Sequence, residues 1–340
     1  MENKASGALS LNKSLFRNYG WEWMLLVIFV LINVMNALIS PYYQLGQMLD
    51  ATNAFLDKGF LAMSMAFIIV TGYIDISVAS IVALSSVVMA VSFNAGVPMG
   101  LAVVICLLTG ALCGAFNGLL LNKFKELAPM IVTLATQIIY RGIALIILED
   151  QASGNFPDWF DFLGWGMIGP FPCMLVVFAV IFVLFTFVMH KTNYGRMLYA
   201  VGKNKVTCRF SGINVDRVVF INFLLNGLMA GVTALFLTSR MGSTRPNVAI
   251  AYEMDVIAMV VLGGVSTAGG KGRMGGVLIS IFIVGLIRYG LGLININAQV
   301  LMMVVGGLLV LAVALPELLQ DYKRRQHVKQ VERALANKPE

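Results

Sequence analysis

Residues 70–80 read VTGYIDISVAS, and the one carboxylate of this stretch, Asp75, constrains how the chain can fold. Apolar runs flank it on both sides, LAMSMAFIIVT at 61–71 and IVALSSVVMAV at 81–91. A charge deep in hydrocarbon costs about 3 kcal/mol or more, so Asp75 has to face protein, a partner or water. Because Gly72 lies close by, we expect a break between two helices here, with a wet or protein-lined cavity around the carboxylate.

The whole chain has the composition of a membrane protein. Of its 340 residues, 59% are hydrophobic and only 12% are charged, whereas an average soluble domain has about 25% charged residues. Repeated apolar stretches approach the roughly 20 residues that a helix needs to cross a bilayer. We therefore predict an all-α polytopic membrane protein with about ten transmembrane helices, some of them broken, in two related halves. The predicted spans are 21–39, 51–71, 76–94, 98–121, 129–148, 170–190, 218–238, 255–265, 274–292 and 298–315.

Two of these spans are weak, one in each half of the chain. The span 51–71 contains Asp57 and Lys58, and the span 255–265 is short and runs into GGVSTAGG. Short or glycine-interrupted spans in both halves of a transporter are typical of broken helices near a substrate pathway.

The basic residues indicate the orientation of the chain. If the N-terminus is inside, nineteen of the 24 Lys and Arg residues lie in inside segments, and only Lys58, Arg240 and Arg245 lie outside. This asymmetry satisfies the positive-inside rule, which a missing or extra span would disturb. The sequence thus predicts a cytoplasmic segment at 1–20, a transmembrane domain at 21–315 and a cytoplasmic tail at 316–340.

The sequence offers no recognisable enzyme, metal or nucleotide site. The run GGKGRM at 269–274 fails the phosphate-binding loop pattern, because Gly270 stands where that pattern requires lysine. The four cysteines form no CxxC pair, and no histidine joins a nucleophile and an acid in a recognisable set. No basic patch interleaved with aromatic residues indicates nucleic acid binding. We therefore expect no enzymatic activity, no cofactor, no metal and no nucleic acid partner.

The longest polar segment between spans is the inside loop KTNYGRMLYAVGKNKVTCRFSGINVDR at 191–217. It carries six basic residues and one acid, which is typical of a solvated positive-inside loop. Phe210, Ile213 and Val215 also give it apolar faces that a simple connection does not need. These faces favour a short amphipathic helix that docks on another protein.

Two stretches resemble a known family. AVGKNKVTCRFSGINVDRVV at 200–219 and AYEMDVIAMVVLGGVSTAGGKGRMGGVLIS at 251–280 are similar to the membrane permeases of bacterial ribose-type sugar ABC importers. GYIDISVAS at 72–80 resembles the GGIDLSVGS segment of that family, and GALCGAFNGLLL at 110–121 and PMIVTLAT at 129–136 are similar to it as well. The resemblance covers most of the predicted transmembrane domain.

The resemblance implies a permease subunit in the bacterial inner membrane, with both termini in the cytoplasm and lipid around it. A second permease copy, identical or different, completes the pathway in such importers, and cytoplasmic ATPase subunits drive it. A periplasmic or lipid-anchored binding protein delivers a monosaccharide such as ribose, rhamnose or xylose, or the signal autoinducer-2. The residues that the resemblance assigns to ATPase coupling are Asn204, Lys205, Arg209, Ser211 and Gly212.

The chain departs from the family pattern at several positions. Tyr73 and Ala79 replace two glycines, and the bulk of Tyr73 could narrow the local path. Lys205 stands where the family has an acid, which changes the sign of charge in the expected docking segment. Such a chain could suit one half of a heterodimer.

Polar side chains within or beside the spans are candidates for the sugar pathway or gate. They are Asp75, Ser77, Asn117, Gln137, Arg141 and Asn226. Asp75 has two interpretations: it caps the helix that starts near Ile76 by accepting from the amides of Ser77 or Val78, or it also lines the sugar route. Carboxylates and amides are suitable hydrogen-bond partners for a neutral polyol.

The other candidates also have a structural alternative. Asn117 and Asn226 favour hydrogen bonding between helices, while Gln137 and Arg141 are four residues apart and share a helical face. A competing function is an ion-coupled secondary transporter that uses Asp75. The apolar faces of the 191–217 loop favour the ATP-driven importer, because a self-sufficient transporter needs no docking site for an ATPase.

Overall fold

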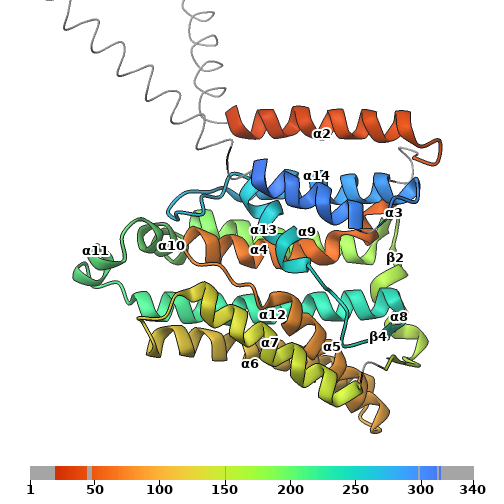
Figure 1. The fold of residues 1–340 in the computed structure, drawn as a ribbon, viewed down its shortest axis with the longest axis horizontal. Helices are drawn as coiled ribbons and strands as arrows, with labels where there is room; N and C mark the ends of the chain where they lie inside the picture. The colour runs from red at the N-terminus through yellow and green to blue at the C-terminus, as the bar shows by residue number, and fades with distance from the viewer. Residues whose placement is uncertain (1–19, 44–47, 150, 298, 312–313, 315–340) are drawn as a thin grey trace, which may run out of the picture.

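The protein is a bundle of helices, seen here in a computed structural model that describes residues 20–43, 48–149, 151–297, 299–311 and 314 (Figure 1). Within these described residues, six helices are long and apolar enough to cross a membrane. They are α2 (Gly20–Ile39), α6 (Met99–Lys123), α7 (Pro129–Leu148), α9 (Cys173–Lys191), α12 (Val215–Met241) and α14 (Met274–Leu293). The all-α polytopic class predicted from the sequence fits this structure.

The prediction of about ten transmembrane helices, some of them broken, is not confirmed in number, because four of the predicted spans coincide with shorter helices. These are α4 (Leu56–Val70), which follows α3 (Met48–Ala51) and the 3-10 helix η2 (Thr52–Ala54), then α5 (Val78–Asn94), α13 (Tyr252–Leu262) and the helix Gln299–Leu311. Short helices are tolerated where protein satisfies their ends: Gly270 N donates to the last carbonyl of α4, that of Val70, at 2.7 Å. Residues 1–19 and 316–340, the expected terminal segments, lie outside the described residues, and the two related halves stay a prediction.

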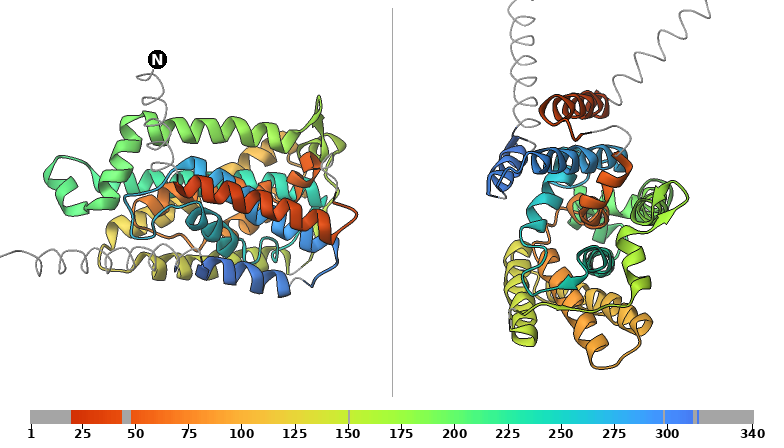
Figure 2. Two further views of the ribbon diagram at one scale, coloured as in Figure 1. Left: turned by 90° about the horizontal axis from the view of Figure 1, so that it is seen from above. Right: turned by 90° about the vertical axis from the view of Figure 1, so that its right-hand side faces the viewer.

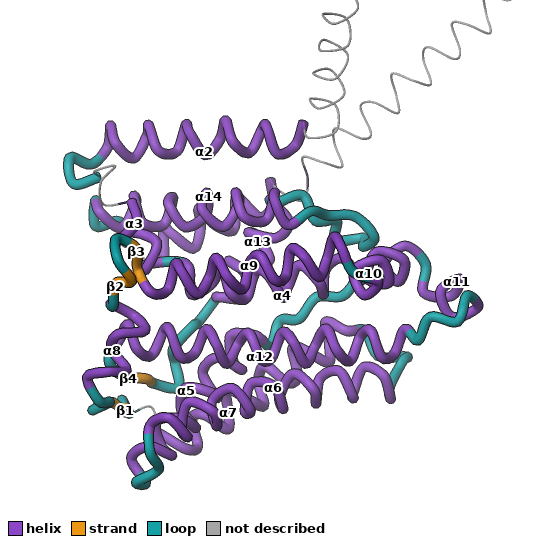
Figure 3. The backbone as a smooth tube through the Cα atoms, turned by 180° about the vertical axis from the view of Figure 1, so that it is seen from behind, coloured by secondary structure: helices purple, strands orange, loops and turns teal. Residues whose placement is uncertain are grey.

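The two ends of the bundle carry different structures (Figure 3). At one end project α10 (Asn193–Lys203) and α11 (Lys205–Phe210), which form the predicted inside loop. At the opposite end lie α8 (Asp158–Trp165) and two short antiparallel strand pairs. The pairs are β1 (Ser153–Gly154) with β4 (Ser243–Thr244), and β2 (Met167–Ile168) with β3 (Phe171–Pro172).

Helix α12 is the centre of the bundle, and it packs most closely against α6 through glycines. A methyl group added to Gly227 of α12 would lie 2.2 Å from the carbonyl oxygen of Gly110, and one added to Gly114 of α6 would lie 2.2 Å from that of Phe223. Gly110 and Gly114, like Gly227 and Gly231, are four residues apart. Small residues at this spacing let two membrane helices approach backbone to backbone.

Helices α4 and α2 differ most in their burial. Every residue of α4 is buried, including Asp57 and Lys58 near its start. Helix α2 lies along the outside of the bundle beside α14 (Figure 2), where the Asn36 side chain donates to the Leu286 carbonyl at 2.9 Å. Because α4 has no exposed face, its polar side chains must find partners within the protein.

The chain breaks between α4 and α5, as the sequence predicts. Gly72 has φ of +76°, a left-handed conformation that favours glycine, and its amide donates to the Ile69 carbonyl at 2.9 Å. Residues 73–76 then form no helix, and α5 begins at Val78. The break leaves Asp75 in the interior of the bundle, between two buried helices.

Candidate functional site

Asp75 is fully buried and holds the end of the break against α12. Its Oδ1 accepts from the amide of Ser77 at 2.9 Å and from the Ser77 hydroxyl at 2.6 Å. Its Oδ2 accepts from the side-chain amide of Asn226 on α12 at 2.9 Å. The Ser77 contact is the one that the capping interpretation expects, while the Asn226 contact joins residues 151 positions apart.

The hydrogen bonds continue from Asp75 into four helices. Asn117 of α6 donates to the Ser77 hydroxyl at 2.8 Å and accepts from Tyr140 of α7 at 2.9 Å. On the other side, Ser64 of α4 donates to Asn226 at 2.7 Å. All of these side chains are buried. We call this set the inner polar cluster; its members are Ser64, Asp75, Ser77, Asn117, Tyr140 and Asn226.

The inner polar cluster contains four of the six predicted pathway residues. It is rich in hydroxyl and amide groups, whose hydrogen bonds polarise and strengthen one another in a low-dielectric interior. Both Asp75 oxygens are occupied and the side chain is inaccessible to solvent in this structure. The arrangement ties α4, α5, α6, α7 and α12 together where the chain is broken, so it closes this part of the bundle.

The other two predicted pathway residues, Gln137 and Arg141, lie together on α7 but outside the inner polar cluster. Gln137 donates to Glu253 Oε1 of α13 at 3.3 Å. Arg141 donates to the carbonyl of Val248 at 2.8 Å and to that of Pro246 at 2.5 Å. Arg141 therefore holds the 246–248 segment against α7. Glu253 Oε2 is buried without a hydrogen-bond partner.

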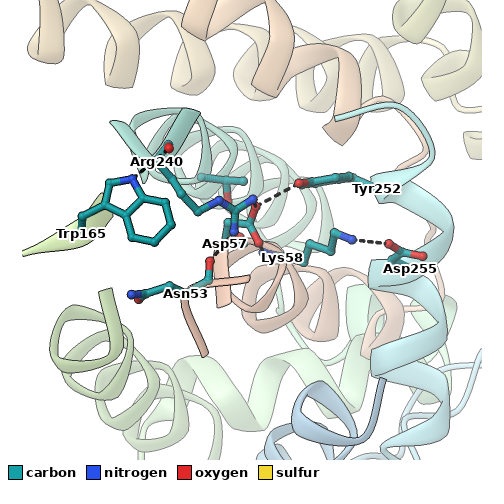
Figure 4. Close-up of polar contacts among 8 residues, drawn as sticks. Asn53, Asp57, Lys58, Trp165, Arg240, Tyr252 and Asp255 are labelled. Carbon is teal, nitrogen blue, oxygen red and sulfur yellow. Dashed lines mark hydrogen bonds and ion pairs between the residues drawn. The ribbon is translucent and has the colours of Figure 1, made fainter. Parts of the chain in front are cut away.

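A buried ion network lies near the end that carries α8, and sequence reasoning missed it (Figure 4). Asp57 of α4 is completely buried; its Oδ2 lies 3.1 Å from Arg240 Nη2 of α12 and accepts from the hydroxyl of Tyr252 on α13 at 2.9 Å. The next residue, Lys58, places its Nζ 2.7 Å from Asp255 Oδ2 and 4.4 Å from the centre of the Tyr252 ring. The network joins α4 to both α12 and α13.

A third cation completes this group. Arg288 Nη2 of α14 lies 2.5 Å from Asp255 Oδ1, so one carboxylate pairs with both Arg288 and Lys58. We call the set the outer ion network; its members are Asp57, Lys58, Arg240, Tyr252, Asp255 and Arg288. Asn53 Oδ1, buried beside it, has no hydrogen-bond partner.

The charged residues of the weak span 51–71 were a sequence signal for this network, but they led to a different prediction. We took Asp57 and Lys58 as signs of a weak span and counted Lys58 and Arg240 among outside-segment cations. In the structure Lys58 lies buried in α4, and Arg240 lies in the last turn of α12 with only 17% of its side chain exposed. Paired charges in weak spans were the available signal, because intramembrane ions persist where partners neutralise them.

Within the described residues, no group of three His, Cys, Asp or Glu side chains is placed to hold a metal ion. The four cysteines are free and lie buried or half-buried. The chemistry that the described sites offer is hydrogen bonding and ion pairing.

The five predicted coupling residues occupy the projecting end, but three of them, Asn204, Arg209 and Lys205, have partners within the chain. Asn204 caps α11, since its side chain accepts from the amides of Val206 at 2.9 Å and Thr207 at 3.0 Å. Arg209, predicted to offer its guanidinium to a partner, already pairs with Asp216 at 3.2 Å. Lys125 pairs with the other oxygen of Asp216 at 2.6 Å.

The tip of this end is exposed and partly apolar. Phe210 is 90% exposed and Val206 is 63% exposed, both on α11. Ser211 and Gly212 follow as an exposed turn, in which Gly212 adopts φ of +79° with open space around it. A six-residue helix that holds a phenylalanine ring out into solvent is an anchor suited to a pocket on another protein.

The remaining coupling residue, Lys205, points to the chain's own break. Its Nζ lies 3.6 Å from the centre of the Tyr73 ring, so two of the three departures from the family pattern meet in space. Burial, and secondarily the positive charge of Arg209, lower the pKa of Lys205 from its ordinary value. The lysine that replaces an acid is therefore half-buried against an aromatic face.

Comparisons with known proteins show which permeases the chain is similar to. A family model described as "Branched-chain amino acid transport system / permease component" matches residues 47–313. The autoinducer 2 import system permease protein LsrD of Yersinia enterocolitica is 34% identical over 309 residues, 88% of this chain and 92% of the relative. The ribose import permease protein RbsC of Bacillus subtilis is 36% identical over 290 residues, which are 85% and 90% of the two chains. No solved structure matches the chain.

Proposed function

Because this chain belongs to the family of branched-chain amino acid transport system permease components, we propose that it is the transmembrane permease subunit of an ATP-driven importer. Its cargo is a ribose-type monosaccharide or autoinducer-2, delivered by a substrate-binding protein. The domain 21–315 forms the pathway together with a second permease copy. The importer lies in the bacterial inner membrane, and both termini of the chain are cytoplasmic.

The observation that carries the proposal is the exposed end formed by α10 and α11. These helices contact both broken regions of the bundle: the Tyr199 hydroxyl of α10 donates to the Gly272 carbonyl at 2.8 Å, and Lys205 of α11 packs on Tyr73. The same end presents Phe210 and Val206 to solvent. An ATPase that binds this end can therefore displace two segments together: the turn after α13, through α10, and the break after α4, through α11.

The inner polar cluster supports a role as the cytoplasmic gate of the pathway. In the structure its hydrogen bonds are mutually satisfied, and it joins helices from distant parts of the chain. A sugar hydroxyl donates and accepts hydrogen bonds as Ser77, Asn117 and Asn226 do, so a passing sugar exchanges partners with them. Asp75 then has two states: it holds Ser77, the residue before α5, when the gate is closed and meets the sugar when it opens.

The choice of cargo rests on the relatives and on the chemistry of the cluster. Two relatives with 34% and 36% identity are named for autoinducer 2 and ribose, whereas the family description names branched-chain amino acids. An amino acid carries both an ammonium and a carboxylate, and the inner polar cluster contains one carboxylate and no cation. Neutral hydroxyl-rich cargo therefore suits it better.

The test is co-purification of the cognate ATPase with tagged chain in mild detergent. Replacement Phe210→Ser removes the exposed ring at the tip of α11 and should abolish or strongly reduce recovery of the ATPase. The matched control is Ile168→Ser, which removes an exposed apolar side chain at the opposite end and should leave recovery unchanged. Equal recovery with both variants contradicts docking through α11.

A further inference from the structure

Lys205 and Tyr73 form a contact between two segments that are far apart in the sequence. Lys205 is the first residue of α11, and Tyr73 lies in the break two residues before Asp75. The ammonium lies 3.6 Å from the ring centre, within the roughly 6 Å at which a cation is attracted to an aromatic face. Resting on the proposed function, we propose that this pair is a clasp that transmits movement of α11 to the gate at Asp75.

The surroundings of Lys205 leave the ring as its principal partner. Asp216, a carboxylate at this end of the bundle, pairs with Arg209 and Lys125. Lys205 takes part in none of the ion pairs formed among the described residues. Its charge is thus directed to the bundle, while Phe210 and Val206 remain exposed for the ATPase.

Tyr73 is connected in turn to both sides of the gate. Its amide donates to the Ile68 carbonyl of α4 at 3.2 Å. Its ring meets Phe223 of α12 edge to face, with centres 6.2 Å apart and planes at 88°. Phe223 is three residues before Asn226, the partner of Asp75, and lies on the same side of the helix. A displacement of the Tyr73 ring therefore shifts Asp75 through the backbone of residues 73–75. It also shifts Asn226 through the contact with Phe223.

The chain supplies a matched control for this contact. Lys123 lies 5.8 Å from the ring centre of Phe124, its neighbour in sequence. That pair joins no separate segments, so its loss removes a lysine from the same end of the bundle without breaking a connection. Lys123→Met is therefore the counterpart of Lys205→Met.

The experiment measures sugar imported per ATP hydrolysed by the full importer in proteoliposomes with its binding protein. Lys205→Met and Tyr73→Leu should each lower this ratio about fivefold. The double variant should be no worse than either single variant, because both remove one contact. Lys205→Arg and Tyr73→Phe keep a cation and a ring and should retain the ratio, as should Lys123→Met. The ATPase should co-purify with every variant, which separates coupling from docking and from misfolding.

Results other than these contradict either the clasp alone or the proposed function as well. If the unaltered importer moves sugar with ATP but Lys205→Met keeps its ratio, the clasp alone is wrong. The clasp is also wrong if the losses of the two single variants multiply in the double variant. If the unaltered importer moves no sugar with ATP, the proposed function fails and the clasp fails with it.

Discussion

Breaking the Asp57–Arg240 pair of the outer ion network should destabilise the protein strongly. Asp57 is completely buried and accepts from Arg240, Tyr252 and the amide of Lys58. Asp57→Asn leaves the Arg240 guanidinium, 17% exposed, without its carboxylate. Removing one partner of a buried ion pair costs about 3–5 kcal/mol. Because Arg240 keeps its hydrogen bond to the Asn53 carbonyl, we expect a loss near the lower limit, about 3 kcal/mol.

A double-mutant cycle separates this effect from a general loss of packing. Arg240→Met leaves Asp57 charged in a dry site and should cost a similar amount. The double variant removes both charges, and its stability should lie within about 1 kcal/mol of the unaltered chain, because it leaves no unpaired charge in the buried site. The coupling energy, the amount by which the loss in the double variant falls short of the two single losses together, should therefore be about 5 kcal/mol. The control is Lys125→Met, which breaks a pair that is 50% and 40% exposed and should cost less than about 1 kcal/mol.

The assay is the free energy of unfolding of the purified chain in mixed micelles, titrated with denaturing detergent and followed by tryptophan fluorescence and circular dichroism. Coincident transitions in the two signals establish two-state behaviour. A cost of Asp57→Asn no larger than that of Lys125→Met would refute the reasoning, because the network would then lie in water.

Three further variants test other parts of the account. Gly227→Leu should prevent α12 from packing on α6 and abolish recovery of folded protein, whereas Gly100→Leu, with open space around it, should be tolerated; a folded Gly227→Leu protein would contradict the close approach. Cysteines at Ala152 and Val206, both exposed, should react with an impermeant thiol reagent from opposite sides of the membrane, and labelling of both in intact cells contradicts the topology. The Asp75→Asn variant should assemble with the ATPase but import less sugar. Full sugar uptake by this variant would contradict a role of the carboxylate in the gate.

The sequence predicted features that depend on nearby residues. The break at Gly72 and the contact of Asp75 with Ser77 follow from glycine conformation and from a carboxylate two residues before an amide. The apolar side chains of the 191–217 loop indicated a short helix, and α11 is such a helix, which presents Phe210 to solvent; its docking on another protein stays a prediction. In each case local chemistry was sufficient, because the interacting groups lie within a few residues of one another.

Features that depend on distant partners escaped prediction. Asp75 bonds Asn226 and Asp57 pairs with Arg240, contacts that span 151 and 183 positions. Tyr73 and Lys205 were each noticed as departures, but nothing in the sequence indicates that they meet. The span predicted at 51–71 was too long, because α4 begins only at Leu56 and hydropathy does not register that Gly270, a distant residue, satisfies the carbonyl at its other end.

The source of energy is the central claim, and uptake of labelled sugar into proteoliposomes tests it most directly. The vesicles contain the chain, its ATPase and a second permease copy, with the binding protein outside and ATP inside. The account predicts uptake that requires ATP and binding protein together and that stops when the catalytic acid of the ATPase is replaced. Uptake that proceeds without the ATPase, driven by a proton or sodium gradient and lost in Asp75→Asn, would contradict it and establish an ion-coupled transporter.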